Sequence, residues 1–338
     1  MKHATHNPIL KINFVSHLHP FYYNGGGEQV TQKIVEEGIK RGHNIKIVSM
    51  KPSKLQIFSR ILMHRNPDLW ILFDAFNCPD HKTHFSRRFI NKIISSQKYI
   101  LGQNAYGDIC YLNALPCNGN IGNGSVCVEK KDTYFNYRDN EKGWQNGYCP
   151  VNDNRTLFEK SLLNIFVSPL HASVFHKIYP VTGEKKYILK PLIDVDMFTD
   201  KTQNRDIKYA ACGGMGESKG FYNIMKKFSN EEVVLFGSND NLLPKKHAFG
   251  KVIGRIPYEK MPEFLNRVEN YIHLTRWPEP HGLIVNQAAL CGCKLITNEN
   301  VGAMTHDFDI MDRNAYRDTA PALWNKLERL IVAPGEKR

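Results

Sequence analysis

The sequence predicts an α/β fold in which two doubly wound domains face each other across a cleft. In both halves of the chain, short apolar runs alternate with stretches whose apolar residues recur at helical spacing, a pattern typical of βαβ units in a parallel sheet. The chain has 338 residues. A single hydrophobic core usually organises fewer residues than this. We therefore expect a first domain over residues 1–190, a second over 191–318, and a C-terminal helix and tail over 319–338.

The first half contains five apolar runs and three amphipathic segments. We expect strands at 11–16, 44–50, 69–76, 99–104 and 163–168, and helices at 28–43, 54–65 and 85–97. In the first helix Val30, Ile34, Val35 and Ile39 fall on one face, as a helix that covers a sheet requires. The helix at 54–65 is both amphipathic and basic.

The second half repeats the scheme after a join expected near 187–198. We expect strands at 208–214, 232–238, 251–256, 271–275 and 294–298, and helices at 218–228, 258–268, 282–291 and 319–332. In open α/β sheets, ligands bind beyond the carboxyl ends of the strands. The expected binding site is therefore the cleft.

Residues 105–160 interrupt the alternation. This span is rich in Asn, Gly, Asp and Tyr and shows little periodicity, so we expect an irregular insertion in the first domain. It contains Cys110, Cys117, Cys127 and Cys149, and four thiolates can hold one structural zinc ion. Their spacing lacks a CxxC pair, so buried reduced thiols are the alternative, in keeping with a cytoplasmic location expected from an N-terminus without a signal sequence.

Two glycine-rich turns are placed where a strand leads into a helix. Gly25, Gly26 and Gly27 form one turn, and Gly213 and Lys219 belong to the other. A helix N-terminus presents free N–H groups that bind anions. A lysine there is mildly unfavourable unless an anion such as phosphate is bound. Ordinary tight turns and a surface lysine are the alternatives.

The stretch WPEPHGLIVNQAALCGC, residues 277–293, combines an irregular turn with a helix. Pro278 and Pro280 place the start of the helix near Gly282. Glu279 then lies in the loop, and Gln287 lies in the second helical turn. In that arrangement a carboxylate can accept sugar hydroxyls, a helix end can hold phosphate, and an amide can reach a ribose. The alternative is an exposed loop acid and a solvated glutamine.

Together these stretches resemble the retaining glycosyltransferases with the GT-B fold that carry a Glu-x7-Glu motif, the GT4-like group. The resemblance covers almost the whole chain. Its pieces are GGGEQ (25–29), RGH (41–43), VSP (167–169), PLIDVDMF (191–198), KG (219–220), VVLFGS (233–238), YEKMPEFL (258–265), EPHGLIVNQAAL (279–290) and NVGA (300–303).

The resemblance implies a sugar donor bound by the second domain, a UDP-sugar above all, and no required cofactor or catalytic metal. It implies that Glu279 binds sugar hydroxyls and that Lys219 neutralises the diphosphate, which the N–H groups of Gly282 and Leu283 would also bind. The implied catalytic residues are Glu279, Lys219 and Asn104, and the implied donor-binding residues are Gly25, Gly26, Gly27, Gly213, Lys219, Glu279, His281, Gly282, Leu283 and Gln287. The C-terminal helix is implied to cross back onto the first domain.

The sequence departs from the family pattern at three positions. Gln287 replaces the second Glu, Gly214 replaces an Arg, and Asn104 replaces a His. A neutral amide at position 287 can still bond to a ribose, and Arg255 or Arg276 could supply a cation. These departures keep open an alternative to the enzyme: a catalytically degenerate nucleotide-sugar-binding protein or subunit.

The charge is distributed unevenly along the chain. Residues 1–190 carry 25 Lys and Arg against 14 Asp and Glu, whereas residues 191–338 carry 20 against 19. A basic first domain attracts polyanions, so two acceptors fit. One is hydroxymethylated DNA, as in phage DNA glycosylation in the host cytoplasm. The other is a lipid- or polysaccharide-linked glycan at the anionic inner membrane, where 54–65 would be an interfacial helix. A lysine-rich face that only keeps the protein dispersed is the remaining interpretation.

Overall fold

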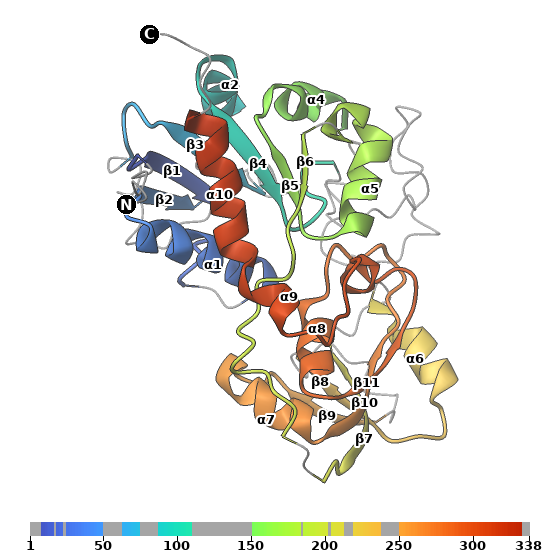
Figure 1. Cartoon of the computed structure of the whole chain (residues 1–338). Coiled ribbons are helices and arrows are strands. Elements are labelled where there is room, and N and C mark those ends of the chain that lie inside the picture. Colours follow the sequence, from blue (N-terminus) through green and yellow to red (C-terminus); the bar gives the residue numbers. More distant parts are fainter. Residues whose placement is uncertain are drawn as a thin grey trace.

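The computed structural model contains two parallel β-sheets, each covered by helices on both faces (Figure 1). It describes residues 8–16, 18–22, 25–49, 63–74, 87–109, 151–183, 185–201, 204–212, 219–237 and 250–332. The expected pair of α/β domains is confirmed. The domain limits placed at 190 and 318 remain predictions.

The first sheet has the strand order β2-β1-β3-β4-β5-β6. Its strands are β1 (Lys11–Ser16), β2 (Asn44–Ser49), β3 (Leu69–Phe73), β4 (Tyr99–Gln103), β5 (Asn164–Phe166) and β6 (Lys186–Ile188). Successive strand residues face opposite sides. Side chains such as Val15 and Leu72 pack with α2 (Arg87–Ser96), α4 (Val151–Lys160) and α5 (Pro169–Ile178). Phe14 and Ile71 pack on the other face with α1 (Gly26–Lys40).

The second sheet has the strand order β11-β10-β7-β8-β9. Its strands are β7 (Ile207–Cys212), β8 (Val233–Phe236), β9 (Lys251–Gly254), β10 (Val268–His273) and β11 (Lys294–Thr297). One face packs against α7 (Met261–Asn266) and α8 (Leu283–Leu290). The other face packs against α6 (Phe221–Lys227) through Phe221 and Ile224.

The observed elements differ from the expected ones at a few places. The span 105–160 is not irregular throughout, because α4 occupies its last ten residues. Helix α5 was not foreseen; Ser168 caps it by accepting a hydrogen bond from the His171 N–H at 3.0 Å. Helix α6 begins at Phe221, three residues after residue 218, where the sequence predicts its start. The basic segment 54–65 falls almost wholly outside the described residues, as do Cys110, Cys117, Cys127 and Cys149.

The C-terminal helix α10 (Thr319–Val332) lies against the first domain (Figure 1, red). The Trp324 indole N–H donates to the Ile34 carbonyl of α1 at 2.8 Å. A Cβ on Gly38 would lie 2.2 Å from the Trp324 ring, so only glycine leaves room for this side chain. Beside it, Glu328 accepts hydrogen bonds from Arg41 at 3.1 Å and from His43 at 3.0 Å.

Two segments connect the domains, and hydrogen bonds join them to each other. The first leads from β6 to β7 and includes Val195 and Phe198, and the second includes the short helix α9 (Asn314–Arg317). The Arg313 guanidinium donates to the Phe198 carbonyl at 3.1 Å and also to the Val195 carbonyl. Tyr316 of α9 accepts a hydrogen bond from Asn286 of α8 at 3.2 Å.

We predict that Trp324→Ala lowers the free energy of unfolding by about 3–5 kcal/mol, because it leaves a large cavity against α1. Chemical denaturation followed by circular dichroism measures the change. Lys326→Ala, at an exposed position of the same helix, is the control and should change stability by less than about 0.5 kcal/mol. Equal effects of the two substitutions would show that α10 is not anchored through Trp324.

Candidate functional site

A cavity of about 700 Å³ lies between the two domains. From the first domain it is lined by the start of α1 and by Asn104 and Val167, which follow β4 and β5. From the second domain it is lined by Cys212 at the end of β7, by Arg255 after β9, and by residues 279–284. The lining comes from the carboxyl ends of strands in both sheets, where ligands of doubly wound folds bind.

The loop before α8 is held in place from both domains. Tyr106 of the first domain donates its hydroxyl proton to the Pro278 carbonyl at 2.7 Å. Ser168 donates to the Pro280 carbonyl at 2.5 Å. Within the second domain, the Gly302 N–H donates to the Glu279 carbonyl at 3.0 Å, and Glu279 forms a β-bridge with Val301. This loop therefore has a fixed position relative to both domains.

Gly282 turns the chain from this loop into α8. Its φ of +85° lies in the left-handed region that favours glycine. Gly282, Leu283 and Ile284 all line the cavity, so the first turn of the helix borders it. The N–H groups of a first turn have no partner within the helix. This end of α8 can therefore bind an anion.

Glu279 is a buried carboxylate with a basic partner on each oxygen. The Lys219 ammonium lies 2.5 Å from Oε1, and the His273 Nε2 lies 2.5 Å from Oε2. Glu279 is only 7% exposed. Burial by itself raises the pKa of this carboxyl, but Lys219 and His273 outweigh burial and hold the pKa well below its ordinary value. Glu279 is therefore ionised at neutral pH, and the alternative of an exposed loop acid is wrong.

Lys219 is brought to this carboxylate by the glycine that follows it. Gly220 has a φ of +75°, and a Cβ there would lie 1.7 Å from the Leu274 carbonyl oxygen after β10. The close approach places Lys219 beside Glu279 rather than in the first turn of α6. Its ammonium also lies 5.4 Å from the centre of the Trp277 ring, a cation–π distance. Lys219 thus contacts two residues that line the cavity, and it is not a free surface lysine.

The glycine-rich turn of the first domain faces α8 across the cavity. Gly26 and Gly27 line the cavity, whereas Gly25 is the N-cap of α1. A Cβ on Gly26 would lie 3.6 Å from the Leu283 side chain, and one on Gly27 would lie 3.4 Å from Asn104. The turn therefore closes the cavity from the first-domain side.

Asn104 is held in position by a hydrogen bond to Asp74, a residue that the sequence did not indicate. The Asn104 backbone N–H donates to Asp74 Oδ1 at 2.9 Å, and its side-chain amide donates to the Gly27 carbonyl at 3.4 Å. Burial, together with the nearby Asp108 and Glu28, raises the pKa of Asp74 to about 7. The Asn104 Oδ1 is buried and has no hydrogen-bond partner among the described residues.

The remaining expected site residues divide into those at the cavity and those that are not described. Gln287, in the second turn of α8, lines the cavity and is 5% exposed, so it is not a solvated helix residue. His281 also lines the cavity and is 8% exposed, and its Nε2 has no hydrogen-bond partner among the described residues. Gly213 and Gly214 lie outside the described residues. Of the two arginines considered above, Arg255 lines the cavity and remains the candidate to supply a cation there.

In the described part of the chain, no group of His, Cys, Asp and Glu side chains has the arrangement of a metal site. Among the same residues, no helix combines the length and the apolar character needed to span a membrane.

The sequence matches no protein-family model. It also matches no curated protein sequence. Solved structures do resemble the fold. The HepE protein of Anabaena in complex with UDP and glucose superposes with a TM-score of 0.55 at 12% identity, over 96% of this chain and 92% of that one. The same protein with UDP-glucose gives 0.51 at 13% identity over 96% and 92%. A glycosyltransferase from Rickettsia africae gives 0.53 at 10% identity over 95% and 91%. The two-domain fold of this chain is therefore the GT-B fold.

Three histidines near the domain junction make stability sensitive to acid. Burial lowers the pKa of His171 and His281 to about 3 and that of His306 to about 4. In the unfolded chain each binds a proton near pH 6.5. We predict that the free energy of unfolding falls between pH 6.5 and about pH 4, by about 1.4 kcal/mol per pH unit for each histidine that protonates only on unfolding.

Denaturant titrations at a series of pH values measure this slope. His306→Gln should make it shallower, whereas His176→Gln, at an exposed position on α5, should leave it unchanged. A stability that stays constant from pH 6.5 to pH 4 would contradict the prediction.

Proposed function

We propose that this protein is a retaining glycosyltransferase that moves a sugar from a nucleoside-diphosphate sugar, a UDP-sugar above all, to an acceptor hydroxyl. The observation that carries the proposal is the ionised Glu279, held against Lys219 beside the N-terminus of α8 in the cavity between the domains. The GT-B fold supports it, since the HepE structures of that fold contain UDP, or UDP-glucose, or UDP and glucose.

The positions of these groups support a role for each in donor binding. Glu279 would accept hydrogen bonds from hydroxyls of the donor sugar. The first-turn N–H groups at Gly282 and Leu283 would bind the diphosphate, and Lys219 would balance its charge. Gln287, one turn further along α8, would reach the ribose. The second domain, proposed to span residues 191–318, would thus bind the whole donor.

The first domain, proposed to span residues 1–190, would complete the site from the other side. Gly26 and Gly27 would close over the phosphates. Asn104 lines the cavity and would contact the sugar of the donor. The neutral His281 would bind the donor from the α8 side.

In the proposed reaction the bond between the sugar C1 and the diphosphate oxygen breaks, and the acceptor oxygen bonds to C1 from the same face. The departing phosphate takes the acceptor's proton, so no pair of carboxylates has to flank the bond as in glycosidases. Negative charge builds on the leaving phosphate in the transition state. Donors that already point at that charge lower the barrier most effectively. Lys219 and the amides at the start of α8 would fill this role.

A binding protein without catalysis is the second candidate. Gln287 and Asn104 favour it, because both replace ionisable residues of the related enzymes by neutral amides. The same pocket geometry would then serve to sense or present a nucleotide sugar.

We predict that Lys219→Met lowers turnover by roughly ten- to a thousandfold, the range seen when one donor to a developing anion is removed. Release of nucleoside diphosphate from UDP-glucose, UDP-galactose, UDP-arabinose or GDP-mannose measures turnover. Lys226→Met, in the last turn of α6, is the matched control and should retain the wild-type rate. A wild-type protein that binds one of these donors but never releases nucleoside diphosphate would favour the binding protein instead.

We predict salt-sensitive retention of the protein on one of the two proposed acceptors. Binding to a polyanion releases its condensed counterions, and this release is less favourable at higher salt concentration. Retention on hydroxymethylated DNA but not on anionic phospholipid vesicles would identify DNA as the acceptor. The reverse result would identify a membrane-associated glycan. Retention on neither would leave the basic first domain with a role in solubility alone.

A further inference from the structure

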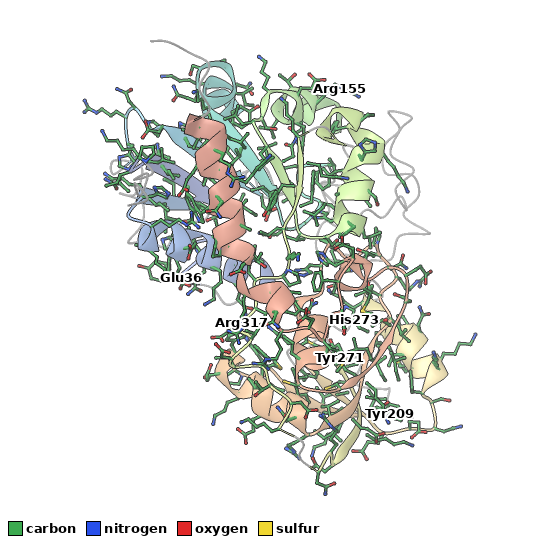
Figure 2. All side chains as sticks on the ribbon, viewed as in Figure 1. Glu36, Arg155, Tyr209, Tyr271, His273 and Arg317 are labelled. Carbon is green, nitrogen blue, oxygen red and sulfur yellow. The ribbon has the colours of Figure 1, made fainter. Side chains whose placement is uncertain are left out.

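The carboxylate of Glu279 has a second partner besides Lys219, His273, and the proposed function gives it no role. His273 is the last residue of β10 and is 5% exposed. Its neighbours in the chain, Ile272 and Leu274, are apolar and buried. A histidine in such a strand loses hydration, which is offset only if both ring nitrogens have partners. Figure 2 shows His273 together with Tyr271 within the second domain.

Both ring nitrogens of His273 have partners. Nε2 lies 2.5 Å from Glu279 Oε2, and Nδ1 lies 3.2 Å from the Tyr271 hydroxyl. An ionised carboxylate only accepts hydrogen bonds, so Nε2 must carry the proton of its bond to Glu279.

These contacts place a proton on Nε2, whichever role Nδ1 has toward Tyr271. Tyr271 and His273 both belong to β10. The hydrogen bonds therefore connect this strand to the loop that carries Glu279.

The consequence is a fixed orientation of the carboxylate. Oε2 is taken by His273 on the buried side, and Oε1 is shared with Lys219, whose side chain is 29% exposed. Without a donor at position 273, the Oε2 atom of a buried anion would be unsatisfied, and the carboxyl group would turn to find another partner.

We propose that His273 is a positioning residue for sugar recognition: it holds Glu279 so that Oε1 is presented to the sugar of the bound donor. This inference rests on the proposed function, in which Glu279 binds sugar hydroxyls. His273 does not touch the nucleotide in this arrangement. Its loss should therefore weaken the contribution of the sugar to binding and leave the contribution of UDP intact.

The test compares the dissociation constants of UDP and of the UDP-sugar that the wild-type protein binds, measured by calorimetry. In His273→Phe, the ratio of the UDP-sugar constant to the UDP constant should rise about tenfold, the size expected for a hydrogen bond to a charged group. The UDP constant itself should stay within about twofold. In His273→Gln the ratio should stay near the wild-type value, because the glutamine amide places a donor where Nε2 stood.

His43→Gln is the matched control, since His43 is also buried and also bonds to a glutamate, Glu328. His43 follows the C-terminal end of α1, whereas the cavity is lined by the start of that helix. This substitution should leave the ratio unchanged even where it lowers stability. An unchanged ratio in a folded His273→Phe protein would overturn the inference, as would equal losses in the Phe and Gln variants. A wild-type protein that binds neither UDP nor a UDP-sugar would instead refute the proposed function.

A second measurement addresses the hydrogen-bond chain without any ligand. Nitrogen-15 NMR of histidine-labelled protein should show a proton on His273 Nε2, with its signal shifted in Glu279→Gln. A ring protonated on Nδ1 alone, or a signal that does not change with the Glu279 substitution, would overturn the inference.

Discussion

The candidate site depends on keeping one carboxylate charged inside the protein. Glu279 is almost wholly buried, and an ion in that position is stable only with partners of opposite charge or strong donors. Lys219 reaches it because Gly220 allows the chain to approach the end of β10, and His273 reaches it as the last residue of that strand. The start of α6 is thereby tied to the end of β10 and to the loop that follows it. Removing Lys219 or His273 would leave the buried charge of Glu279 only partly balanced.

The loop that carries this carboxylate also joins the two domains. Tyr106 and Ser168 come from the first domain, and they donate to the carbonyls of Pro278 and Pro280, which flank Glu279 on either side. Neither proline belongs to a strand or a helix, so these carbonyls are not used in a regular hydrogen-bond ladder. The two prolines therefore do more than delay the start of α8. They leave acceptors that the first domain uses to position the loop.

Much of this arrangement could be predicted from the sequence, since the strands and helices follow the periodicity of their apolar residues. The placement of Glu279 in a loop and Gln287 in the second turn followed from the two prolines and Gly282. The contacts across space could not be predicted this way. The pairing of His273 with Glu279 depends on how the loop after β10 folds back, where Glu279 bridges to Val301. Asp74 meets Asn104 only because β3 and β4 are neighbours. A polar residue inside an apolar strand run was the available signal for His273. Helix α4 was missed because its polar composition masks its periodicity.

The paired connections between the domains limit how this cavity can change shape. Two domains joined by a single linker can rotate relative to each other in several directions, whereas two linkers that are bonded to each other restrict this rotation. Arg313 fastens them by bonding to the carbonyls of Val195 and Phe198, and Trp324 then secures the second linker's continuation to α1. The loop before α8 is also bonded to Tyr106 and Ser168 of the first domain, so the two domains are joined at a second place. The distance across the cavity between Gly26 and Leu283 is therefore constrained from both ends.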